Sequence, residues 1–158
     1  MSATSLSSTP IGATLAWTNS NTDIGLGASG SGNVPAFSTT NSTTSLINGS
    51  IDVTPTLNGC AGTAVNYVIT VNPTPSIIAP SNQTVCPGAS MSATNLSSTP
   101  IGATLAWTNS NTDIGLGSSG SGNVPAFSTT NSTTSAINGS IDVTPTLNGC
   151  VGSAANYI

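Results

Sequence analysis

A near-perfect internal repeat constrains this fold more than any other feature of the sequence. Residues 1–68 align with residues 91–158 at an offset of 90 without a gap, and 61 of the 68 positions are identical. The copies differ only at Ser5/Asn95, Ala28/Ser118, Leu46/Ala136, Ala61/Val151, Thr63/Ser153, Val65/Ala155 and Val68/Ile158. A repeat of this length predicts tandem domains of one structure. We expect one domain over residues 1–72 and a second over residues 73–158.

The segment between the copies is expected to be a short, stiff joint. The apolar run 67–71 reads as a last strand, and Asn72, Pro73, Thr74 and Pro75 follow it directly. Proline fixes its own φ angle and keeps the preceding residue extended, so this joint differs from a flexible Gly/Ser tether. The last strand of one domain should therefore lead into the first strand of the next with no flexible linker between them.

The absence of basic residues excludes several classes of function. The chain contains no Lys, Arg or His, and its only side-chain carboxylates are Asp23, Asp52, Asp113 and Asp142. Nucleic-acid binding and a polybasic membrane patch both need cations. A histidine-based triad, a lysine Schiff base and a His-rich zinc site are impossible, and no apolar run approaches the ~20 residues that span a bilayer. We predict no enzymatic activity, cofactor, metal, nucleic-acid partner or membrane insertion.

The remaining composition predicts an all-β fold. Apolar residues make up 36% of the chain, and they alternate with Ser, Thr, Asn and Gly in short runs bounded by Pro and Gly turns. About seven such runs per copy, without a helical period, indicate tandem antiparallel β-sandwiches. Leu105 and Trp107 share one face of the clearest strand. We expect a core that contains Trp17, Trp107, Phe37 and Phe127.

Two other segments allow alternative interpretations. Asn138-Gly139 is a strong hairpin signal. However, apolar residues recur at every second position over residues 137–144, as they would in one continuous strand, and this is the interpretation that we favour. Apolar and polar side chains alternate weakly over residues 91–96, and this pattern predicts an outer strand. The first copy lacks its first strand and the second stops part-way through its last, so we read the sequence as a window cut from a longer array.

Several motifs together resemble a known family of repeats. They are residues 84–88 (TVCPG), 105–116 (LAWTNSNTDIGL), 120–127 (GSGNVPAF) and 141–146 (IDVTPT), joined by residues 71–75 (VNPTP). This chain is similar over its whole length to the PKD-like, Ig-like repeats of Bacteroidota surface proteins. Those repeats occur in giant proteins exported by type IX secretion, including gliding-motility adhesins of the SprB type. The resemblance implies Ig-like domains, a location at the cell surface and adhesive or filamentous roles. The lack of basic residues departs from that family.

The cysteines suggest a disulfide in each complete copy. Cys60 and Cys150 are repeat equivalents, whereas the equivalent of Cys86 would fall before residue 1. Two cysteines in a small domain without metal-ligand spacing favour a Cys86–Cys150 bond and an oxidising compartment. Buried or unpaired thiols are the alternative.

Three further motifs have both a functional and a plain structural interpretation. Trp17 and Trp107 could stack on sugars, but core positions are favoured. The spacing Asn109-x-Asn111-x-Asp113 resembles the start of a calcium loop, but a turn whose side chains bond their own backbone is favoured. Asp52 and Asp142 should face outward and discourage edge-to-edge pairing.

Three functions are consistent with the sequence. The first is a structural repeat of a long extracellular filament or adhesin stalk at the cell surface, whose partners are neighbouring repeats and whose surface or glycan ligands bind other domains. The second is a fibre of identical chains, in which a neighbour's strand fills the groove that the absent first strand opens in residues 1–72. The third is a carbohydrate-binding module, which requires Trp107 or Tyr157 to face solvent.

Overall fold

The chain folds as two units, and the computed structural model describes all residues from Met1 to Ile158. Unit 1 comprises Met1–Pro73 and unit 2 comprises Thr74–Ile158. The sequence placed the boundary one residue earlier, before Pro73. No helix in either unit has the length and apolar character needed to cross a membrane.

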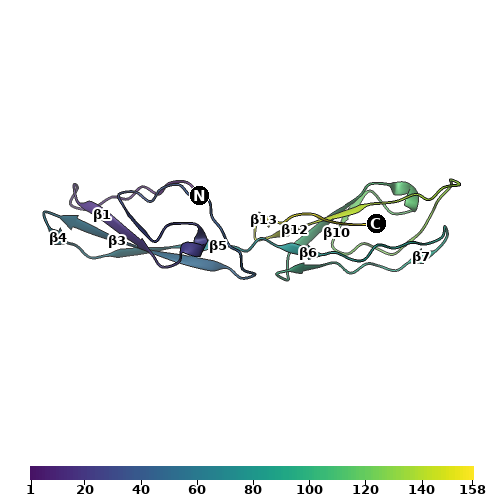
Figure 1. Cartoon of the computed structure of the whole chain (residues 1–158), viewed down its shortest axis with the longest axis horizontal. Helices are drawn as coiled ribbons and strands as arrows, with labels where there is room; N and C mark the ends of the chain where they lie inside the picture. Colours follow the sequence, from purple (N-terminus) through teal and green to yellow (C-terminus); the bar gives the residue numbers. More distant parts are fainter. The chain divides into compact units, whose positions relative to one another are not determined.

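Unit 1 is built on one antiparallel sheet (Figure 1). Its strands are β1 (Thr14–Asn19), β2 (Ser29–Ser31), β3 (Ile47–Leu57), β4 (Cys60–Ala61) and β5 (Val65–Val71). The order is β2-β1-β3-β4, and β5 pairs with the first part of β3. Pro55 lies where β3 changes partner, because β5 pairs with β3 as far as Val53 and β4 pairs from Thr56 onward. The proline therefore removes no bond from either pairing on this side of β3.

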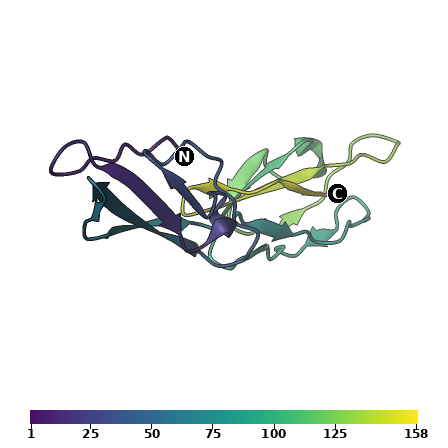
Figure 2. The ribbon, with the colours of Figure 1, turned by 60° about the vertical axis from the view of Figure 1, so that its left-hand side comes forward.

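Unit 2 repeats this sheet and adds further paired strands (Figure 2). Its sheet has the order β10 (Ser119–Ser121), β9 (Thr104–Asn109), β12 (Ile141–Leu147) and β13 (Cys150–Val151), with β14 (Ala155–Tyr157) also paired to β12. Two further pairs are β6 (Ser76–Ile78) with β8 (Ser97–Thr99), and β7 (Ser90–Met91) with β11 (Phe127–Ser128). Strand β6 packs on β12 and β14 and so supplies a second layer.

The predicted all-β, antiparallel sandwich architecture is confirmed, and the fold is compatible with an Ig-like domain. The only helical elements are two three-residue 3-10 turns, η1 (Thr22–Ile24) and η2 (Thr112–Ile114). The outer strand expected over residues 91–96 is not formed, because β7 ends at Met91 and β8 begins at Ser97.

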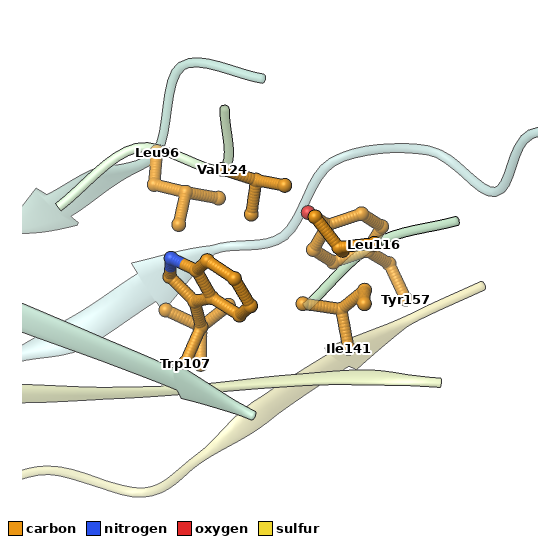
Figure 3. Packing of buried hydrophobic residues seen from close by; sticks show 7 residues of the cluster. Leu96, Trp107, Leu116, Val124, Ile141 and Tyr157 are labelled. Atoms are coloured by element: carbon orange, nitrogen blue, oxygen red, sulfur yellow. The ribbon is translucent and has the colours of Figure 1, made fainter. Parts of the chain in front are cut away.

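Each sandwich encloses a core centred on a tryptophan. Trp17 and Trp107 are each only 4% exposed, and Phe37 and Phe127 pack against the respective cores at partly buried positions. Figure 3 shows Leu96 and Val124 facing Trp107 across the core of unit 2. Gly120 lies opposite Trp107 in the pairing of β10 with β9, and a Cβ atom there would collide with the indole ring. The glycine allows the ring to lie flat over the neighbouring strand.

The Asn-Gly dipeptide forms no hairpin in either unit, and it lies within a strand only in unit 1. There, β3 runs through Asn48 and Gly49, the equivalents of Asn138 and Gly139. Gly49 is required by packing, because a Cβ atom there would meet the Ile24 side chain and would approach Asn19 Oδ1 to 2.9 Å. In unit 2, the continuous strand predicted over residues 137–144 forms only from Ile141 onward, because β14, which pairs with β12, ends at Tyr157.

Candidate functional site: two open faces of the sandwiches

The four aspartates are exposed and do not converge on a site. No group of three or more aspartate or cysteine side chains comes together in either unit. Asp52 and Asp142 each accept a hydrogen bond of 2.8 Å, from Asn66 Nδ2 and Asn156 Nδ2 respectively. The predicted role of these two aspartates in guarding a sheet edge is wrong, because β3 and β12 are paired on both sides.

The asparagine motif is a turn that its own side chains hold together. Asn109 Nδ2 donates to the carbonyl oxygens of Asn111 (2.9 Å) and Leu116 (3.0 Å), and Asn109 Oδ1 accepts from the Asn111 amide at 3.1 Å. Asn111 Oδ1 in turn accepts from the Asp113 amide at 3.0 Å and caps η2. The side-chain oxygens of Asn109 and Asn111 thus accept hydrogen bonds from backbone amides, as the turn interpretation predicted.

The aromatic side chains that a carbohydrate-binding module would expose are buried. Trp107 is 4% exposed and Tyr157 is 7% exposed, so neither ring is available to stack on a sugar. The Tyr157 hydroxyl and the Trp107 indole nitrogen both lie in the interior without a hydrogen-bond partner. Burial raises the pKa of the Tyr157 hydroxyl above its usual value, and the neighbouring Thr94 side chain acts in the opposite direction.

The predicted Cys86–Cys150 disulfide is not formed, and all three cysteines are free thiols. The Cys86 carbonyl accepts a hydrogen bond from Thr129 Oγ1 at 2.8 Å, and Cys86 lines a pocket beside Ile141, where β12 begins. Cys150 pairs with Leu147, where β12 ends. A strand of this length spans roughly 20 Å, whereas a disulfide needs Cα atoms within about 7 Å.

Unit 1 has an open groove on the face of its sheet. The groove has a volume of about 490 Å³, and its apolar lining consists of Leu6, Leu15, Val53, Pro55, Val65 and Tyr67. In unit 2 the equivalent face is covered by β6, which pairs with β8 and packs on β12 and β14. Segment 7–9, the equivalent of β8, forms no strand in unit 1. The sequence analysis expected an open groove in residues 1–72, and the groove lies on this face of the sheet.

Unit 2 is open on a different part of its core, which the sequence analysis did not identify as a site. Its pocket has a volume of about 200 Å³ and is lined by residues that include Leu116, Ile137, Ile141 and Tyr157. In unit 1 the corresponding region is completed by the end of β5, where Ile69 is 7% exposed and packs in the core. Ile158 is the equivalent of Val68, so residues 69–71 of unit 1 have no equivalent among residues 74–158. This difference between the copies was the signal that could have located the pocket.

A single ten-residue segment supplies the elements that distinguish the two units. Its first part, residues 69–71, ends β5 and contributes to the core of unit 1. Its last part, residues 74–78, covers the sheet of unit 2, where Pro75 is fully buried. Only residues 72–75, the predicted joint, separate β5 from β6. The joint is thus flanked on both sides by residues that complete a core.

Comparison with known proteins gives no further assignment. No protein-family model matches the chain, and no curated protein matches it. The open faces and the segment 69–78 are consequently the structural features from which a function must be argued.

Proposed function

We propose that this chain is a non-catalytic structural repeat of a long extracellular filament or adhesin stalk at a cell surface. The observation that carries the proposal is the segment 69–78, which completes the core of one domain and then the core of the next. Force applied along the chain would load β5 and β6, both of which are held by backbone pairing and by core packing. A joint of four residues with two prolines supports restricted motion between successive domains.

The chemistry of the exposed surface agrees with this role. The surface carries four scattered carboxylates and no cation, and Ser, Thr and Asn fill most of its exposed positions. Such a surface is suited to a stalk that separates a binding domain from the cell without binding ligands itself. The motif resemblance to PKD-like repeats of type IX-secreted Bacteroidota proteins supports the same placement, including a role in adhesion or gliding motility.

A second function, a fibre of several identical chains, is favoured by one observation. The groove of unit 1 exposes apolar side chains that unit 2 covers with a strand. A neighbouring chain could cover them in the same way. This alternative differs from the stalk in the number of chains at each axial position.

Electron microscopy of the native material, with measurement of mass per unit length, tests the proposal. A single-chain stalk predicts a thin string of beads with one 90-residue domain per axial step. Several domains per step would reject the stalk in favour of the multi-chain fibre. Particles without any linear array would reject both.

A further inference from the structure

The groove of unit 1 has the shape and chemistry of a site whose occupant is already visible elsewhere in the chain. Its lining residues Leu6, Val53 and Pro55 are identical in type to Leu96, Val143 and Pro145 of unit 2. In unit 2 these three side chains are buried, with Val143 at 0% exposed, whereas all three are only partly buried in unit 1. The difference follows from β6, which lies over the unit 2 face.

Strand β6 shows how the occupant would sit. Ser76, Ile77 and Ile78 pair antiparallel with Thr99, Ser98 and Ser97. Ile77 packs against the core cluster of unit 2, whereas Ile78 points outward and is 61% exposed. Specific recognition therefore rests on Ile77 and on backbone pairing.

A glycine in each unit provides independent support. Gly152 is buried under Pro75, and a Cβ atom there would overlap the Pro75 carbonyl group. Gly62, its equivalent, is exposed, and a Cβ atom there would meet only Pro55, at 3.0 Å from Cγ and 3.5 Å from the carbonyl oxygen. Gly62 also lacks the left-handed backbone that would demand glycine. The groove of unit 1 therefore keeps free the space that a proline carbonyl occupies in unit 2.

We infer that the groove of unit 1 is a strand-acceptor site for a segment with the sequence of Thr74–Ile78 that belongs to a further copy of the repeat, because the Thr74–Ile78 segment of this chain already covers unit 2. The donated segment would pair antiparallel with residues 7–9 in the register of β6 with β8. Its proline carbonyl would lie against Gly62, and its first isoleucine would enter the space beside Leu6 and Val53. The inference rests on the proposed structural role, since it names the contact through which one repeat joins another. It concerns an uncharged ligand, as expected for a groove without ionisable side chains other than the Tyr67 phenol.

The test adds a synthetic peptide with the sequence of residues 71–80 to the full chain, observed by NMR with residue assignments and by calorimetry. We expect saturable binding of one peptide per chain, with the largest shift changes at Ser8, Val53 and Gly62. A peptide carrying Ile77→Asn should bind at least tenfold more weakly, whereas a peptide carrying Ile78→Ser should bind like the parent. Binding that is indifferent to Ile77→Asn, or shift changes centred on unit 2, would overturn the inference.

A protein variant tests the same contact from the other side. Gly62→Ala should weaken binding of the parent peptide at least tenfold, because the new methyl group occupies the place of the proline carbonyl. Ala61→Val is the matched control, because residue 61 is exposed and its equivalent is Val151. Equal peptide affinity in the Gly62→Ala and unmodified chains would refute the site. If Gly62→Ala fails to fold, the peptides that carry Ile77→Asn and Ile78→Ser still test the acceptor site.

A negative result in the peptide experiment and a negative result in the microscopy would reject different proposals. Beaded single-chain filaments without peptide binding would remove the acceptor site and leave the stalk. Sequence-specific peptide binding by material that forms no filament would leave the acceptor site and remove the stalk.

Discussion

The carbonyl group of Pro75 occupies the space in which a Cβ atom on Gly152 would stand. This contact joins the start of unit 2 to its far end in sequence, because Pro75 precedes β6 and Gly152 follows β13. The Gly152 amide also donates to the Pro145 carbonyl at 2.9 Å, so the glycine is held from two sides. It cannot move away from Pro75 without breaking that bond.

Gly152→Ala should therefore destabilise unit 2. Overpacking against a backbone group costs about 1–3 kcal/mol of unfolding free energy. Denaturant unfolding in a Trp17→Phe background, where Trp107 is the only tryptophan, reports on unit 2. Gly62→Ala in a Trp107→Phe background is the matched control in unit 1. It should lower the unfolding free energy of unit 1 by less than Gly152→Ala lowers that of unit 2. Equal losses in the two variants would show that β6 does not press on Gly152.

Asn109→Ala should also destabilise unit 2, because the buried amide binds several carbonyl oxygens of the following loop. Removing one partner of a buried hydrogen bond costs about 1–3 kcal/mol. Asn156→Ala removes an exposed amide and should stay within about 0.5 kcal/mol of the parent. Denaturant midpoints measured side by side would contradict the assignment if the two variants shifted equally.

Stability should fall at high pH through Tyr157. Burial raises the pKa of its hydroxyl above the ordinary value of 10.0, so the folded state holds this proton more tightly than the unfolded chain. The corresponding stability is fully present below pH 10.0 and is lost as the pH rises through the folded pKa. Tyr157→Phe should flatten this part of the pH profile of the unfolding free energy. An unchanged slope in Tyr157→Phe would assign the effect to other groups.

All three thiols should react with a thiol reagent without prior reduction, because none is paired. Cys60 and Cys86 are exposed and should react faster than Cys150, which is partly buried. A colorimetric thiol titration on the folded chain measures the count and the rates. A count of one thiol per chain would instead support the Cys86–Cys150 bond that the number of cysteines per repeat suggested.

The sequence predicted those features that depend on neighbours along the chain. Leu105 and Trp107 alternate with small or polar exposed residues, and this period of two is a direct consequence of strand geometry. The groove of unit 1 was predictable because β6, which covers the same face in unit 2, has no equivalent among residues 1–73. In both cases the information lies within one strand or in the comparison of the two copies.

The errors concern features that depend on strand order. Asp52 was assigned to an edge, but β3 is central, and no local pattern shows which strand is central. Cys86 and Cys150 were paired by counting, although they lie at opposite ends of β12. The hairpin signal of the Asn-Gly dipeptide was correctly set aside, but the local pattern did not reveal why Gly49 is needed, because the close approach of Ile24 joins residues 25 positions apart.

The substitutions between the copies have a consequence for the evolution of such arrays. All seven first-copy residues at these positions are exposed, so the substitutions leave unchanged the buried side chains that the two copies share. Gene copies that encode interchangeable interiors can recombine out of register by whole repeats without creating a misfit in any domain. The length of the array is thereby free to change by unequal crossing-over, while the residues that differ can diverge on the surface. The length of the array can thus evolve independently of the stability of its domains.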